Sequence, residues 1–137
     1  MKFQGKIAIW FWFMIIAGNV VFLYAFLYAI LYEEDSVGAM IMGIVLFNLI
    51  CIPIVARNYV IVSEISVTVY FGFYKESIML RDITEVRRTH DIIASTAASL
   101  DRISINGRWN GLMCAVKDKE GFFEELKRKN PNIKMYI

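Results

Sequence analysis

Cysteine, proline and histidine are scarce in this chain of 137 residues, which contains two cysteines, two prolines and one histidine. Two cysteines are too few for a disulfide scaffold or a cysteine-based zinc cluster. A net charge of only +2 makes a nucleic-acid partner unexpected, because proteins that bind nucleic acid carry a strongly basic face. No glycine-rich phosphate loop is present, so we expect no cofactor. Apolar residues, by contrast, make up 58% of the chain, which excludes intrinsic disorder.

Charged residues are absent from two long stretches, residues 7–32 and 36–56. A helix of about 20 apolar residues crosses a hydrocarbon core of about 30 Å, so each stretch is long enough to span a bilayer. Because only three residues separate the stretches, the two helices should be antiparallel neighbours. We therefore predict a transmembrane helical hairpin over residues 1–57, multi-pass in the cell membrane, with the lipid bilayer as a partner. A cleaved signal peptide is the alternative, but its apolar region of about 7–15 residues would be much shorter.

Basic and acidic residues flank these stretches asymmetrically. Lys2 and Lys6 precede the first stretch, and Arg57 follows the second. The connecting loop is acidic and consists of Glu33, Glu34 and Asp35. Because basic residues favour the cytoplasmic side, we predict that both termini are cytoplasmic and that the loop is extracellular. The loop could contact a cationic peptide arriving from outside, or it could act only as a solvated topology marker, and both interpretations stay open.

Small and polar residues within the two stretches are candidates for contacts between the helices. Helices in membranes associate through small residues, which let backbones approach closely, and through polar side chains that hydrogen-bond. The candidate interhelical residues are Gly18, Asn19, Ala25, Ala39, Gly43 and Asn48. Asn19 and Asn48 lie at similar depth when counted from the cytoplasmic ends, so an interhelical hydrogen bond is favoured over a ligand or partner contact.

Residues 58–137 have a different pattern, because alternation of apolar and polar residues replaces the continuous apolar runs. The alternation predicts strands over residues 58–63, 66–71, 73–80 and 83–89. A further hairpin is predicted with Asn106 and Gly107 in a type I′ turn, because both residue types accept positive φ.

A C-terminal amphipathic helix is predicted to begin at an Asp118 cap and to stop at Asn130 and Pro131. The chain is therefore expected to be of the α+β class. Its domain boundary falls after residue 57, and residues 58–137 form a cytoplasmic domain.

Residues suited to catalysis are few. A Ser-His-Asp arrangement would have to combine His90 with Asp91 or Asp101 and with Ser95 or Ser99. A lone histidine more often lies on a surface without a catalytic role, and no ligand pair has zinc spacing. We therefore expect neither an enzyme nor a metal site.

Basic residues could instead contact the inner leaflet of the membrane. The candidates are Arg57, Lys127, Arg128 and Lys129, since basic residues at the surface are attracted to anionic lipid. For the last three, a solvated helix end that matches the helix dipole is the simpler interpretation.

Three stretches carry a resemblance to a known family, namely residues 99–103 (SLDRI), 117–122 (KDKEGF) and 130–133 (NPNI). Together with the preceding hairpin, they resemble the bacterial YyaB-like PH domain family. The resemblance implies a PH-like, partly open antiparallel β-barrel capped by a C-terminal helix.

The same resemblance implies that the chain protects its producer cell against a bacteriocin of the sublancin type. Protection would come from non-catalytic binding or shielding at the cell membrane, with the bacteriocin peptide or its membrane target as partner. The alternative is a membrane-tethered PH-like adaptor that binds a protein partner or an anionic lipid. The family has no shared catalytic motif to transfer to this chain, and the oligomeric state is left open.

Overall fold

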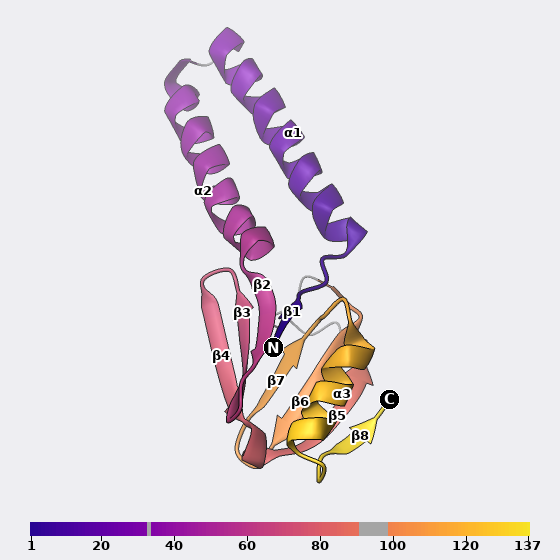
Figure 1. Cartoon of the computed structure of the whole chain (residues 1–137). Coiled ribbons are helices and arrows are strands. Elements are labelled where there is room, and N and C mark those ends of the chain that lie inside the picture. Colours follow the sequence, from indigo (N-terminus) through magenta and orange to yellow (C-terminus); the bar gives the residue numbers. More distant parts are fainter. Residues whose placement is uncertain (33, 91–98) are drawn as a thin grey trace.

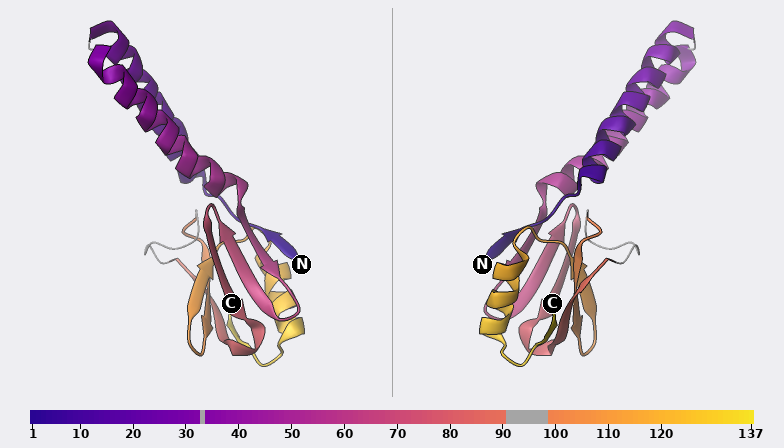
Figure 2. Two further views of the ribbon diagram at one scale, coloured as in Figure 1. Left: turned by 90° about the vertical axis from the view of Figure 1, so that its left-hand side faces the viewer. Right: turned by 90° about the vertical axis from the view of Figure 1, so that its right-hand side faces the viewer.

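The structure is a computed structural model that describes residues 1–32, 34–90 and 99–137 (Figure 1). Glu33, Asp91 and Ser95, which enter the predictions above, lie outside the described residues. Two long helices, α1 (Ile9–Tyr32) and α2 (Val37–Ala56), form an antiparallel hairpin that projects from a β-rich domain (Figures 1 and 2). A short 3-10 helix, η1 (Glu34–Ser36), lies at the tip of this hairpin, far from the domain.

The hairpin helices expose most of their apolar side chains. In each helix only 6% of the most apolar stretch of 18 residues is buried inside the protein. Both helices are long and apolar enough to cross a membrane. On α1 the less exposed positions, among them Phe11, Ile15, Phe22 and Ala29, recur three or four residues apart and face α2. The helices therefore pack against each other along one narrow stripe, unlike the core helices of a soluble domain.

The strands of the domain form two four-stranded sheets around one core. The first sheet has the order β1-β2-β3-β4 and is antiparallel throughout. The second has the order β7-β6-β5-β8, in which β8 alone pairs in parallel, with β5. The strands are β1 (Lys2–Gln4), β2 (Asn58–Val62), β3 (Ser66–Phe71), β4 (Tyr74–Met79), β5 (Ile83–Thr89), β6 (Arg102–Gly107), β7 (Gly111–Cys114) and β8 (Lys134–Tyr136).

Helix α3 (Lys119–Lys129) covers the core, and a 3-10 turn, η2 (Leu80–Asp82), joins the two sheets. The Asp118 carboxylate accepts a hydrogen bond from the Gly121 backbone nitrogen at 3.0 Å, so the predicted N-cap is present. Phe122 and Leu126 on α3 are fully buried against the sheets. The sheets do not close into a complete barrel. The predicted α+β fold class, with antiparallel strands followed by a C-terminal helix, is confirmed.

The first residues of the chain belong to the domain as well as to the hairpin. Strand β1 pairs with β2, and the Met1 nitrogen donates a hydrogen bond to the Val62 carbonyl at 2.6 Å. The buried Phe3 ring lies edge-on to Phe122, with centroids 5.3 Å apart. The domain boundary predicted after residue 57 places β1 in the hairpin alone. A strand of three residues is too short to show the alternation of apolar and polar residues by which strands are predicted.

The segment after β1 also joins the two sheets. Gly5 forms an isolated β-bridge with Val116. On either side of this bridge, the Lys6 nitrogen donates to the Ala115 carbonyl, and the Lys117 nitrogen donates to the Gln4 carbonyl, both at 2.9 Å. The N-terminal segment therefore lies hydrogen-bonded between the edge of β2 and the chain that follows β7.

The predicted type I′ turn at Asn106 and Gly107 is wrong. Strand β6 continues through both residues, and Asn106 pairs with Gly111 on β7. Within the described ranges, the single residue with positive φ is Gly72, so neither turn residue adopts the required conformation. A Cβ atom at Gly107 would lie 2.9 Å from the Asn110 backbone oxygen and 2.6 Å from Ile78 Cδ1, which indicates that glycine is needed there for close packing.

Replacing Phe3 by alanine should lower the free energy of unfolding by about 3–5 kcal/mol, because it removes a buried ring and leaves a cavity beside Phe122. Denaturant unfolding of the full chain in detergent, followed by near-ultraviolet circular dichroism, measures this loss. Phe73→Ala is the matched control, since Phe73 is exposed and should change stability by less than about 0.5 kcal/mol. Equal effects of the two substitutions would contradict the assignment of β1 to the core.

Candidate functional site

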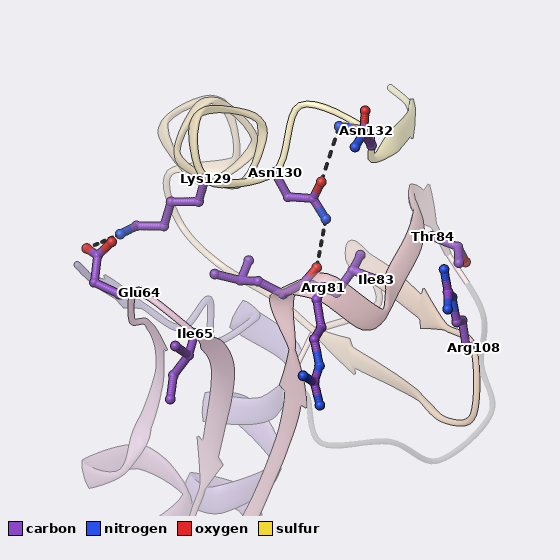
Figure 3. A pocket seen from close by; sticks show the side chains of 10 residues that line it. Glu64, Ile65, Arg81, Ile83, Thr84, Arg108, Lys129, Asn130 and Asn132 are labelled. Atoms are coloured by element: carbon purple, nitrogen blue, oxygen red, sulfur yellow. Dashed lines mark hydrogen bonds and ion pairs between the residues drawn. The ribbon is translucent and has the colours of Figure 1, made fainter.

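A pocket of about 580 Å³ lies at the end of the domain opposite the hairpin (Figures 1 and 3). It forms where the β2–β3 turn, η2, the start of β5, the β6–β7 turn and the end of α3 meet. The lining residues are Glu64, Ile65, Leu80, Arg81, Ile83, Thr84, Arg108, Lys129, Asn130 and Asn132. Because four separate segments of the chain contribute, the pocket exists only in the folded domain.

Polar contacts hold one wall of the pocket in place (Figure 3). The Asn130 amide donates a hydrogen bond to the Leu80 carbonyl at 2.8 Å and accepts one from the Asn132 nitrogen at 3.2 Å. Lys129 forms an ion pair with Glu64 across the opening between α3 and the β2–β3 turn. The Lys129 ammonium lowers the pKa of the Glu64 carboxyl. Asn130 therefore fixes the end of α3 against η2, which defines the shape of the pocket.

The rim of the pocket is cationic and partly apolar. The lining contains three cations, Arg81, Arg108 and Lys129, and one carboxylate, Glu64, which pairs with Lys129. Arg81 also lies 3.9 Å from the Asp82 carboxylate, outside the lining. Trp109 follows Arg108 in the β6–β7 turn and is 89% exposed. Arginine and tryptophan are the residue types that contribute most at protein interfaces, so this rim suits a segment that carries carboxylates and an apolar anchor.

No sequence pattern predicted this site. Its residues lie in turns and at the ends of elements, far apart in the chain, and no motif relates them. The one available signal was an arginine and a tryptophan together in a short turn, where an exposed aromatic residue has no role in the core.

A second polar cluster, centred on Asp101, lies at the end of the domain that faces the hairpin. Its carboxylate forms ion pairs with Lys6 at 2.9 Å and with Lys119, and His90 Nε2 lies 3.8 Å away. These ammonium groups lower the pKa of Asp101 to about 2. Asp101 thus connects the start of β6 to the segment before α1 and to the first residue of α3.

Of the residues considered for catalysis, the structure describes His90, Ser99 and Asp101. The His90 side chain is 77% exposed, and no hydrogen bond joins it to Ser99, which is buried and accepts a hydrogen bond from the Asp101 nitrogen at 3.3 Å. Burial raises the pKa of Cys114 to about 12, so its thiol stays protonated. Residues 1–32, 34–90 and 99–137 contain no group of three or more histidine, cysteine or acidic residues arranged to hold a metal ion.

The basic residues predicted to contact the inner leaflet are not brought together. Arg57 lies directly after α2, at the base of the hairpin, whereas Lys127, Arg128 and Lys129 lie at the far end of α3 (Figure 1). Arg128 and Lys129 both contact Glu125, at 2.8 Å and 3.6 Å. Arg128 lowers the pKa of Glu125, and Glu125 in turn raises the pKa of Arg128. The cationic end of α3 is therefore partly neutralised and remote from the hairpin.

Inside the hairpin, the Asn48 amide donates a hydrogen bond to the Asn19 side-chain oxygen at 2.8 Å. Two glycines provide space for phenylalanines of the opposite helix. A Cβ atom at Gly18 would lie 2.5 Å from the Phe47 ring, and one at Gly43 would lie 2.9 Å from the Phe22 ring.

The remaining predicted interhelical residues differ from each other. Ala25 is half-buried beside the buried Ala29, whereas Ala39, one turn before Gly43 on α2, is exposed. Of the predicted extracellular loop, Asp35 lies exposed in η1 at the tip of the hairpin.

Comparison with known families matches residues 57–130 to the bacterial PH domain family. The match covers more than half of the chain, and the chain belongs to this family. No curated protein and no solved structure matches it. A PH-like domain behind two apolar helices suggests a membrane-associated binding or adaptor protein.

The stretches that carried the family resemblance have structural roles here. Asp101 of residues 99–103 pairs with Lys119 of residues 117–122, and Asn130 of residues 130–133 fixes the end of α3. The resemblance in these stretches therefore reports the fold, and it does not identify a ligand.

Replacing Asp101 by asparagine should lower the free energy of unfolding at pH 7 by about 1–2 kcal/mol, after allowance for solvent screening. The pKa in the folded state, about 2, lies below the ordinary value of 3.8. The stabilisation is therefore fully present above pH 3.8 and is lost as the pH falls toward 2. Thermal unfolding of the full chain in detergent at several pH values checks this. The unfolding temperatures of the unsubstituted chain and of the Asp101→Asn variant should converge at acidic pH. Glu124→Gln, at an exposed carboxylate on α3, should show no such convergence.

Proposed function

We propose that this chain is a binding protein anchored in the cell membrane, with a hairpin that crosses the bilayer twice and a cytoplasmic domain that recruits a partner. The two apolar helices and their lack of burial support the crossing. Because β1 pairs with β2, the residues flanking the hairpin lie on one side of the membrane. Lys2, Lys6 and Arg57 are on that side and the acidic residue Asp35 is at the other end, which favours the cytoplasm for the domain.

The cationic pocket is the observation that carries the binding role. It opens at the end of the domain farthest from the hairpin, where a soluble protein can reach it without competing with lipid. Arg81 and Arg108 provide charge that steers an acidic segment, and Trp109 provides an exposed apolar anchor beside them. The partner expected from this chemistry is a cytoplasmic protein with a carboxylate-rich segment.

A photo-crosslinking amino acid at position 109 should form an adduct with this partner in unstressed cells. Reversing Arg81 and Arg108 to glutamate should reduce the adduct at least about tenfold, because a hot-spot side chain contributes about 2 kcal/mol or more. Lys127→Glu is the matched charge reversal, on an exposed lysine that does not line the pocket. Adducts that are insensitive to the arginine reversals, or equally sensitive to Lys127→Glu, would contradict a partner at this pocket.

A narrower form of the proposal is immunity of the producer cell to a sublancin-type bacteriocin. Its support is the resemblance of residues 99–103 and 117–122 to the YyaB-like family, together with an acidic loop that would face outward. Protection would act by binding or shielding, without catalysis. The exposed position of His90 supports that part.

Expression of the chain in a sensitive strain should raise the inhibitory concentration of sublancin, and His90→Ala should protect equally well. A variant with Glu33→Gln, Glu34→Gln and Asp35→Asn tests whether the loop contacts the peptide, since loss of its charge should reduce protection. Unchanged sensitivity, with the protein present in the membrane fraction, would falsify immunity and leave the adaptor role.

A further inference from the structure

Three cationic side chains surround two tyrosines on the outer face of the sheet that contains β1 to β4. The rings of Tyr59 and Tyr70 are stacked, with centroids 4.8 Å apart. Lys2 Nζ lies 4.0 Å from the centroid of Tyr59. Arg57 Cζ and Lys75 Nζ lie 5.7 Å and 5.4 Å from the centroid of Tyr70. The strand register creates this cluster, because it pairs Tyr59 with Tyr70 and Tyr70 with Lys75.

An exposed phenylalanine lies next to this cluster, at the base of the hairpin. Phe73, which is 75% exposed, follows Gly72 in the β3–β4 turn. The Gly72 nitrogen donates a hydrogen bond to the Arg57 carbonyl at 2.8 Å, and a Cβ atom at Gly72 would lie 3.1 Å from Ile54 on α2. Since Gly72 also has a φ of +60°, only glycine lets the turn pack so closely on α2. The β3–β4 turn, which contains Phe73, therefore lies beside the last turn of α2 (Figure 1).

The cations of this cluster have no carboxylate partner in the part of the chain that the structure describes. Across residues 1–32, 34–90 and 99–137, no ion pair involves Lys2, Arg57 or Lys75. Other lysines near the ends of elements, such as Lys6 and Lys129, do have one. The positive charge of the cluster is therefore available to an external anion.

We propose that this membrane-proximal surface docks on anionic phospholipid headgroups, with Phe73 inserted at the boundary of the acyl chains. The surface consists of Lys2, Arg57, Tyr59, Tyr70, Phe73 and Lys75. The inference rests on the proposed crossing of the membrane by the hairpin.

The length of α2 places this surface at the depth of the lipid headgroups. The 20 residues of α2 span about 30 Å, the thickness of the hydrocarbon core, so Arg57 directly after them reaches the headgroups. Gly72, which directly precedes Phe73, packs on Ile54 near the same level. Aromatic rings and basic side chains are the residue types favoured at this depth. The docked lipid would also fix the domain, leaving the pocket at its other end accessible.

A depth-sensitive fluorophore on the full chain tests the proposal. The label is attached at Phe73→Cys, in a background with Cys51→Ala and Cys114→Ala, after reconstitution in vesicles of phosphatidylcholine with or without phosphatidylglycerol. Ile65→Cys is the matched site, since Ile65 is 76% exposed in the turn at the opposite end of the first sheet. Spin-labelled lipid should quench the label at position 73 and not at 65, and phosphatidylglycerol should increase the quenching at 73.

Removing one cation should weaken docking by a defined factor. Lys75→Gln should lower the ratio of docked to undocked label about fivefold in vesicles that contain phosphatidylglycerol, as expected for one basic residue near an anionic surface. Lys127→Gln, at the far end of α3, should leave the ratio unchanged. Without any substitution, hydrogen exchange of residues 70–75 should be slower in vesicles with phosphatidylglycerol than in vesicles without it.

The outcomes separate this inference from the membrane crossing. If the chain resists carbonate extraction while the label at 73 is not quenched and exchange is unchanged, the docking surface is refuted and the crossing stands. If carbonate extracts the chain, both are refuted. If the label at 73 becomes shielded only as the protein-to-lipid ratio rises, a second copy of the chain covers the surface, and docking on lipid is refuted.

Discussion

The pairing of β1 with β2 is the constraint on which the rest of the structure depends. The chain leaves the sheet after β1 to form the hairpin and returns through Arg57 into the neighbouring strand. The Gly5 nitrogen donates to the Asn58 carbonyl at 2.8 Å, so the two ends of the hairpin start from adjacent, hydrogen-bonded residues. Strands lie about 5 Å apart and helix axes about 8–10 Å apart, so only short connections are needed to bring the helices into contact. The hairpin therefore emerges from a fixed point of the domain.

Ion pairs reinforce this junction from the opposite sheet. Asp101 at the start of β6 contacts Lys6, which precedes α1, and Lys119, which begins α3. Removal of its charge would leave two ammonium groups close together, so the three segments depend on one carboxylate. The family resemblance in residues 99–103 and 117–122 has a structural explanation. These two stretches contact each other at the end of the domain that faces the hairpin. A resemblance of this kind predicts architecture better than it predicts a partner.

Sequence patterns predicted those elements whose signal is long or local. Continuous apolar runs gave both helices, and a period of two gave β2 to β5 nearly to the residue. Asp118 was found as a cap because a cap depends on its immediate neighbours. The hydrogen bond between Asn19 and Asn48 could be predicted, because the depth of each residue in the membrane follows from counting residues along its helix.

Other features depend on tertiary contacts that no local pattern encodes. Strands β1 and β8 have three residues each and form only by adding to existing edges. Asn106 and Gly107 favour a turn locally, but Gly107 is required within β6 by its contact with Ile78. The pocket could not be predicted, because its lining comes from four segments that are distant in the chain.

Position in the fold, and not the density of basic residues in the sequence, determines which charges can meet the membrane. The run Lys127–Lys129 is the most basic in the chain, yet Glu125 and Glu64 pair with two of its members at the end farthest from the hairpin. Lys2, Arg57 and Lys75 are scattered in the sequence, but strand pairing gathers them on tyrosine rings next to α2. A charge that packs on an aromatic ring keeps its ability to attract anions, whereas a charge paired with a carboxylate does not. In the proposed arrangement, the same domain presents one cationic end to lipid and the other to a soluble partner.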